Sequence, residues 1–346
     1  MTTAARSWTT ALADVRRRLE FLDTVSGPGR LAERMITAFR DGVPPPVVRP
    51  VTVGNSDLRK ILSRGALGAS RFQANTAFVV VGRSGDGLSH CLQWAREEAA
   101  GHGLATLTLN EGFPLNEVDR LQAAILEKST VGERTLMDVL SKPPGRTNRA
   151  AAMGRVHHVA SQLTAGGLLA LQLLFENANQ NHHDQVLELL TWIRGEVMPT
   201  AWRRRYGLPA RALLAPNVPG LATGILTLLE IFGIKGLGVS VEEATEAQLH
   251  AFMTSFRAPG IFLVAATPNQ RHNARGALAL SPLDLRSRQS LAIIIRDLHV
   301  HAYEWKRLGA VSPDRLNEWV LLSVDGTSRD LVRDLVARLD SVLARA

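Results

Sequence analysis

The feature that most restricts the fold of this chain is an apolar run followed directly by a glycine-rich turn. Residues Thr76–Val81 read Thr-Ala-Phe-Val-Val-Val, which is typical of a strand buried on both faces of a parallel sheet. The turn Gly82–Ser89 ends that run, residues 92–99 have helical composition, and Leu104–Leu109 is again strand-like. The order strand, loop, helix, strand predicts a βαβ unit, and therefore an α/β fold built on a parallel sheet.

Two later segments extend the predicted sheet. Leu237–Val241 and Ile261–Ala266 are short and apolar, as strands of a parallel sheet are. Between the two pairs of strands, residues 116–229 show mostly helical periodicity, which indicates a helical insertion. We expect residues 51–275 to form the core domain that contains the sheet and this insertion.

Helices are expected at both ends of the chain. Residues 1–50 read as helices followed by a proline-rich linker, and residues 276–346 read as a helical region. An apolar stripe at helical spacing near the start predicts self-association. The stripe consists of Trp8, Leu12, Val15, Leu19 and Leu22.

The glycine-rich turn fits the P-loop pattern of glycine, four residues, glycine, lysine, then serine or threonine, except at one position. Its residues are Gly82, Arg83, Ser84, Gly85, Asp86, Gly87, Leu88 and Ser89. A turn between a strand and a helix lets the backbone wrap a phosphate that faces the helix N-terminus. This predicts an ATP site with Ser89 on the Mg²⁺ side. The exception is Leu88, which stands where lysine belongs.

The missing lysine makes us expect weak or lost ATP binding and crippled hydrolysis. Leucine cannot neutralise the β- and γ-phosphate charge that phosphoryl transfer depends on. Arg83 is a weak substitute, because its side chain leaves the loop at a different point. The alternative interpretation is a glycine-rich turn that keeps the P-loop shape and binds nothing.

Acidic residues follow the third predicted strand. Glu242 and Glu243 stand at its carboxyl end, where ligands of open α/β sheets bind, so Glu242 would hold Mg²⁺ and Glu243 would activate water. An equally weighted alternative is that both carboxylates complement the dipole of a following helix. Thr267 ends the next strand and is a polar residue that could sense a γ-phosphate.

Taken together, these motifs resemble the ATP-binding proteins of BREX-type bacterial phage-exclusion systems, a branch of the AAA-type P-loop ATPases. The segments that carry the resemblance are Ala32–Pro44, Val80–His90, Trp192–Glu196, Gly236–Ala244, Ala266–Pro268 and Thr327–Leu331. In that family the loop ends Gly-Lys-Ser-His, and this chain keeps Ser89 and His90. The family's Asp-Glu pair corresponds to Glu242-Glu243, and Arg329 matches a sensor arginine. ATPases of this class commonly place the nucleotide between subunits, so the resemblance implies that an arginine such as Arg286 or Arg288 reaches a neighbouring subunit.

The resemblance implies a degenerate, regulatory member that acts with other defence-system or DNA-processing proteins on DNA. The competing hypothesis is a nucleotide-independent DNA-binding or interaction scaffold. A formal charge of +8, carried mostly by arginine, suits phosphate contacts, although a GC-rich genome would give the same bias. The best basic-aromatic patch is Arg203, Arg204 and Arg205 beside Trp202 and Tyr206, and its alternative interpretation is a solvated helix end.

Other functional classes find less support. Apolar runs fall short of the ~20 residues that span a bilayer, and no secretory signal is recognisable, so we expect a soluble cytoplasmic protein. Cys91 is the only cysteine, which excludes an internal disulfide, and no base for it is identifiable. His299 and His301 would share a strand face, but two ligands are too few for a metal site.

Overall fold

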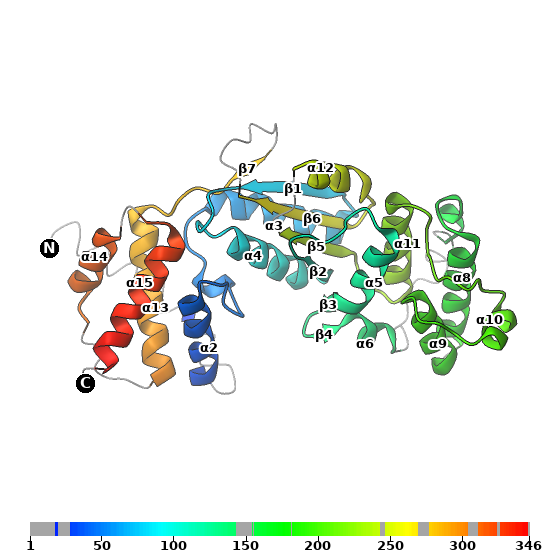
Figure 1. The fold of residues 1–346 in the computed structure, drawn as a ribbon, viewed down its shortest axis with the longest axis horizontal. Coiled ribbons are helices and arrows are strands. Elements are labelled where there is room, and N and C mark those ends of the chain that lie inside the picture. Colours follow the sequence, from blue (N-terminus) through cyan, green and yellow to red (C-terminus); the bar gives the residue numbers. More distant parts are fainter. Residues whose placement is uncertain are drawn as a thin grey trace. The chain divides into compact units, whose positions relative to one another are not determined.

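The chain folds around a seven-stranded sheet flanked by helices (Figure 1). The computed structural model describes residues 18–19, 28–142, 154, 156–180, 182–242, 246–268, 277–303, 311–323 and 326–344. The strand order is β4-β3-β2-β5-β6-β1-β7. The α/β class and the mostly parallel sheet are therefore as predicted.

The strands at the centre of the sheet lie where the apolar runs predict them. They are β1 (Thr76–Val81), β2 (Ala105–Leu109), β5 (Leu237–Glu242) and β6 (Ile261–Thr267). The pairs β2–β5 and β5–β6 are parallel, and every residue of β6 is buried. In β1 only Val80 is buried, so the prediction of full burial on both faces is wrong for this strand. Beyond β1 lies only β7 (Leu278–Ala279), which pairs with it in parallel and is too short to cover it.

Several helices come from the first half of the chain. They are α2 (Pro28–Asp41), α3 (Ser56–Phe72), α4 (Leu88–Gly101), α5 (Val118–Lys128) and α6 (Leu136–Leu140), with the short 3-10 turn η1 (Arg49–Val51). The expected helical insertion also contains a small hairpin. Its strands, β3 (Thr130–Val131) and β4 (Arg134–Thr135), extend the sheet: β3 pairs antiparallel with β2, and β4 pairs antiparallel with β3.

The second half of the chain adds the remaining helices. They are α8 (Ala165–Asn179), α9 (His183–Ile193), α10 (Thr200–Tyr206), α11 (Val218–Ile231), α12 (Glu246–Ser255), α13 (Leu285–Tyr303), α14 (Pro313–Leu322) and α15 (Ser328–Ala344), with the 3-10 turn η2 (Ala160–Gln162). Side-chain caps fix several starts: Thr164 Oγ1 accepts from Gly167 N at 2.8 Å, and Asn217 Oδ1 accepts from Gly220 N at 2.9 Å. No helix among the described residues is long and apolar enough to cross a membrane.

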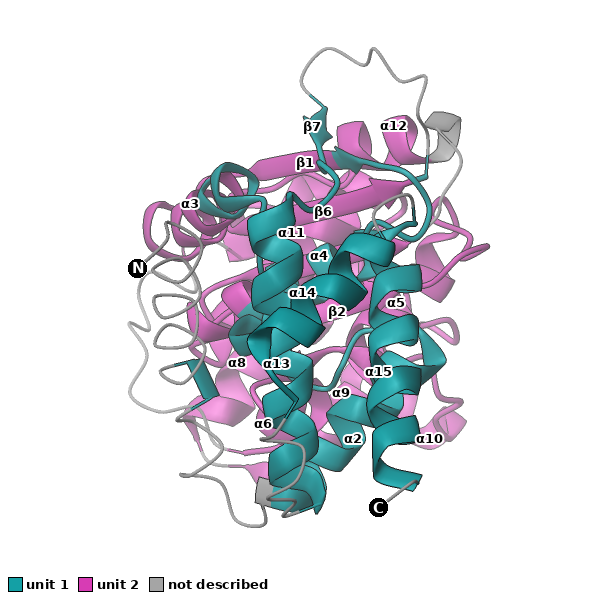
Figure 2. Ribbon diagram, turned by 90° about the vertical axis from the view of Figure 1, so that its left-hand side faces the viewer, with its two compact units in different colours: residues 1–60, 80–97, 268–346 teal, residues 61–79, 98–267 magenta. Residues whose placement is uncertain are grey.

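The chain divides into two compact units (Figure 2). Unit 1 comprises residues 1–60, 80–97 and 268–346, and unit 2 comprises residues 61–79 and 98–267. The core of unit 2 is built from strands β2, β5 and β6 with helices α5, α8, α9 and α11. Trp192 is its largest fully buried side chain, and its Nε1 donates to Pro209 O at 3.2 Å.

The core of unit 1 joins the two ends of the chain. Helices α2, α13 and α15 pack against one another, with Met35, Ile294 and Leu335 fully buried between them. Of the predicted N-terminal stripe only Leu19 lies within the described residues. It is 3% exposed and packs into this same core. An apolar residue of the stripe is thus covered within its own unit.

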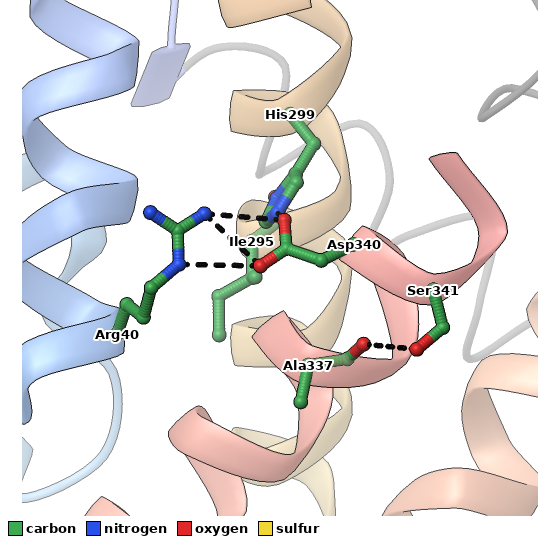
Figure 3. Close-up of polar contacts among 6 residues, drawn as sticks. All are labelled: Arg40, Ile295, His299, Ala337, Asp340 and Ser341. Carbon is green, nitrogen blue, oxygen red and sulfur yellow. Dashed lines mark hydrogen bonds and ion pairs between the residues drawn. The ribbon is translucent and has the colours of Figure 1, made fainter. Parts of the chain in front are cut away.

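A polar cluster links the same three helices (Figure 3). Arg40 of α2 binds the Asp340 carboxylate of α15 through two nitrogens, at 3.0–3.2 Å. His299 of α13 is fully buried, and its Nδ1 contacts Ile295 O at 2.8 Å. Its Nε2 lies 3.5 Å from Asp340 Oδ1 and makes no hydrogen bond with any described residue. Burial lowers the pKa of His299 below its usual value.

The expectation that His299 and His301 share a strand face is wrong, because both belong to α13. Each ring bonds the carbonyl four residues earlier, which is a helical arrangement. The preceding run Leu291–Ile295 contains three β-branched isoleucines and is buried throughout, so it carries no one-sided helical pattern. A helix buried on several faces resembles a buried strand at sequence level.

Candidate phosphate-binding loop

The glycine-rich turn connects β1 to α4 as the sequence predicts. Gly85 and Gly87 have φ angles of +89° and +102°, a region that glycine enters without steric cost. Asp86 N donates to Arg83 O at 3.1 Å, and Cys91 N donates to Gly87 O at 2.8 Å, where the helix starts. The loop therefore has the strand–turn–helix setting in which backbone N–H groups can bind an anion.

Leu88 makes an apolar contact across the start of this loop. Its side chain is only 9% exposed. A Cβ placed on Gly82 would lie 3.3 Å from Leu88 Cδ2 and 3.1 Å from Leu280 Cβ, so Leu88 packs back toward the first glycine. The position that carries a cation in an ordinary P-loop thus belongs to a small apolar cluster in unit 1.

The other side chains of the loop differ in exposure. Arg83 and Ser84 are exposed, Ser89 is half-buried, and Asp86 is 7% exposed. A buried carboxylate within the turn opposes an incoming phosphate, because like charges repel in a poorly solvated site. Hydrogen bonds from Thr327 lower the pKa of Asp330, and the charges of Arg333 and Arg83 lower it further. Arg83 therefore lies near Asp330 in the first turn of α15.

The first turn of α15 packs on the outside of the loop. Arg329 N donates to Gly85 O at 3.0 Å. Thr327 fills the space that a Gly85 side chain would need, since a Cβ there would lie 2.7 Å from Thr327 Oγ1. Asp330 Oδ2 in turn accepts from Thr327 N at 2.9 Å and from Thr327 Oγ1 at 2.7 Å. The contact from Arg329 is made by its backbone, and its side chain is exposed.

His90 and Cys91, the residues after Ser89, are held in their neutral forms. Thr52 Oγ1 donates its one hydrogen to Val48 O at 2.7 Å, so it must accept from His90 Nε2, 2.8 Å away. Burial, and then the charge of Arg59, lower the pKa of His90 to about 4. Burial also raises the pKa of the Cys91 thiol to about 12, which makes it a poor nucleophile.

Of the two predicted acidic residues, Glu242 lies at the carboxyl edge of the unit 2 strands. Glu242 is the half-buried last residue of β5 and pairs in register with Ala266, which places it beside Thr267 at the end of β6. Thr267 is 8% exposed. Glu243 lies outside the described residues. Because the loop belongs to unit 1, a joint Mg²⁺ site of Ser89 and Glu242 stays a prediction.

The basic patch forms most of the short helix α10. Arg203 is engaged locally, with Nε donating to Met198 O and Nη2 to Thr200 Oγ1, both at 3.2 Å. Arg204 and Arg205 are exposed, and the Arg205 guanidinium lies 5.5 Å from the Tyr206 ring centroid. All three arginines occupy the last turn, where they also complement the helix dipole.

Arg288 does not have the role expected of it at a subunit boundary. It is 7% exposed and donates to Leu283 O, Ser323 O and Gly326 O at 2.9–3.2 Å. A guanidinium held by three carbonyls of its own chain cannot extend to a neighbour. Arg286 is exposed.

Sequence reasoning missed the contacts that support the loop from distant parts of the chain. Thr52 lies 38 positions before His90, and no spacing pattern links them. No group of three or more potential metal-ligating side chains occurs among the described residues. No protein-family model matches this chain, and no curated protein matches it.

Proposed function

We propose that this chain is a degenerate ATP-binding regulatory subunit that acts with partner proteins on DNA in bacterial phage defence. The observation that carries the proposal is the packing of the buried Leu88 against Gly82, which Leu280 also approaches, in a glycine-rich loop between a strand and a helix. A backbone cradle without its cation supports weak binding of a nucleotide and argues against fast turnover. Its role would then be to respond to the nucleotide rather than to hydrolyse it.

Several further features support parts of this proposal. Backbone N–H groups at the start of α4 supply donors for phosphate, and Ser89 is half-buried at that point. Glu242 and Thr267 end adjacent strands, as the residues of a Mg²⁺ and γ-phosphate site would. Exposed Arg204 and Arg205 offer phosphate contacts for DNA. The defence context and protein partners come from the resemblance alone.

The test is calorimetric titration of the full-length protein with ATP and Mg²⁺. Wild type should bind weakly, and Leu88→Lys should bind about tenfold or more tightly, because a charged hydrogen bond to phosphate contributes about 1.5–3 kcal/mol. Leu88→Met is the matched control, since it keeps an apolar side chain of similar volume and should bind as wild type does. Brisk ATP hydrolysis by the wild type that Glu243→Gln abolishes would contradict the proposal.

A second candidate is a nucleotide-independent scaffold that keeps the loop only as a structural joint. The buried Asp86 carboxylate favours it, because a carboxylate in the loop repels phosphate. Under this alternative neither the wild type nor Leu88→Lys binds ATP. Asp86→Asn combined with Leu88→Lys would then show whether removing that repulsion restores binding.

A further inference from the structure

The segment Val51–Asn55, which precedes α3, is held in an unusual conformation next to the phosphate loop. Gly54 and Asn55 both have positive φ, +69° and +47°. The Asn55 side chain holds this turn against Ser281, two residues after β7. Its Nδ2 donates to Ser281 O at 3.0 Å, and its Oδ1 accepts from Ser281 N at 2.9 Å. Two consecutive left-handed residues persist only where surrounding contacts determine them.

Two arginines bind the carbonyls of this segment. Arg18 Nη1 donates to Thr52 O at 2.7 Å, and Arg59 Nε donates to Gly54 O at 3.1 Å. Thr52 also contacts His90, which follows Ser89 in the first turn of α4. All of these residues belong to unit 1, so the arginines and the loop are parts of one compact body.

Arg59 is half-buried, and among the described residues no carboxylate pairs with it. Burial, and then the charge of Arg18, lower the pKa of Arg59, although an arginine in a protein remains charged. Elsewhere in unit 1, Arg296 contacts Asp297 at 2.7 Å and Arg338 contacts Asp334 at 2.8 Å. Partial burial of a charge without a counter-ion is unfavourable. An anionic ligand would supply the missing partner.

The neighbouring groups leave this charge uncompensated. The charge of Arg59 reaches His90 and Cys91, and burial keeps both of them neutral near pH 7. Neither group therefore offsets the charge of Arg59. A guanidinium whose Nε is engaged still presents its two amino groups, the fork that recognises phosphate in bidentate fashion.

We propose that Arg59 forms an anion-binding subsite beside the phosphate loop and takes a phosphoryl group. Resting on the proposed function, the subsite supplies part of the positive charge that Leu88 does not. The chemistry fits a phosphate of a nucleotide and free inorganic phosphate alike. The two sources differ in whether the loop is also required.

The test measures binding of inorganic phosphate and, separately, of ATP by calorimetry, together with thermal unfolding in phosphate-free buffer. Arg59→Met should weaken binding of phosphate at least about tenfold, as loss of a charged hydrogen bond does. Arg96→Met is the matched control: Arg96 is another half-buried arginine of unit 1, so the charge change is the same. It should bind phosphate as wild type does.

Thermal unfolding separates a binding role from a structural one. Arg59→Met removes an uncompensated charge, which favours the folded state, and also the hydrogen bond to Gly54 O, which disfavours it. If Arg59 awaits a ligand, the two effects should offset one another, and the melting temperature of the ligand-free protein should change little. Equal phosphate affinity in wild type and Arg59→Met would overturn the subsite, whatever the melting temperature.

The ATP titrations distinguish failure of the subsite from failure of the proposed function. ATP binding by the wild type, with the affinities for ATP and for phosphate both unchanged in Arg59→Met, would sink the subsite and leave the nucleotide proposal standing. Phosphate binding that depends on Arg59 in a protein that does not bind ATP would support the subsite and count against the nucleotide proposal. If Arg59→Met loses binding of both ATP and phosphate while Arg96→Met keeps both, the subsite and the nucleotide proposal are both supported.

Discussion

The backbone N–H of Arg329 donates a hydrogen bond to the carbonyl of Gly85, at 3.0 Å, and so connects the first turn of α15 to the middle of the glycine-rich loop. Thr327, two residues earlier, contacts the same glycine. A change in the conformation of the loop must therefore be accommodated by the start of α15.

Gly85→Ala should destabilise the protein by more than a positive φ alone explains. The left-handed conformation costs an alanine about 1–2 kcal/mol, and the new Cβ would also lie 2.7 Å from Thr327 Oγ1. Gly112→Ala is the control, because Gly112 has φ +75° and a Cβ there would meet nothing within 4 Å. Denaturant unfolding should show a loss for Gly85→Ala at least about 1 kcal/mol larger than for Gly112→Ala. Equal losses would mean that the Thr327 contact is readily relieved.

Stability should fall as the pH drops below about 6.5, the ordinary histidine pKa. The pKa of His90 is lowered to about 4 in the folded protein, and that of His299 is lowered as well. In that window the unfolded chain binds protons that the folded chain refuses, so protonation favours unfolding, and the effect is complete once the pH reaches the folded pKa. Above pH 6.5 both states are neutral and the effect vanishes.

His90→Gln should flatten this pH dependence between pH 6.5 and 4, measured by thermal unfolding at a series of pH values. Each unit of pKa difference corresponds to about 1.4 kcal/mol. The exposed His183 provides the control, and His183→Gln should keep the wild-type slope. A wild-type slope in His90→Gln would show that His90 takes up its proton equally in both states.

Duplex DNA binding, if the arginines of α10 provide it, should be tolerant of sequence and should weaken steeply with salt. Because Arg203 is engaged with Met198 O and Thr200 Oγ1, the exposed pair Arg204 and Arg205 should carry the effect. Replacing both by alanine should reduce the slope of log K against log salt by about 2, one per phosphate contact. An unchanged slope would place the DNA contact elsewhere, and no retention at low salt would favour the scaffold hypothesis.

Self-association remains a prediction, and light scattering on the full-length protein would test it. A truncated chain that starts at Leu31 lacks the whole N-terminal stripe and is the comparison that tests its part in the interface. Because Leu19 packs in the core of unit 1, that truncation should also lower the melting temperature. A full-length monomer at high micromolar concentration would contradict the prediction.

The sequence by itself determined the elements whose signal is local. The four central strands begin and end within one residue of their apolar runs. For β2, β5 and β6 the reason is that a strand buried in a parallel sheet needs consecutive apolar side chains. The turn after β1 could be recognised because positive φ angles at its middle require glycine. Leu88 could also be recognised from the sequence, because it stands at the lysine position of the short P-loop pattern.

Tertiary structure alone decided which distant residues contact one another and which elements carry no local signal. Nothing in the spacing links Thr52 to His90, Arg329 to Gly85, or Arg40 to Asp340, 300 positions away, because such pairs meet only when distant segments pack together. The hairpin of β3 and β4 escaped notice since two-residue strands carry no periodicity. The helical state of His299 was hidden because packing on several sides removes the one-sided pattern by which a helix is recognised.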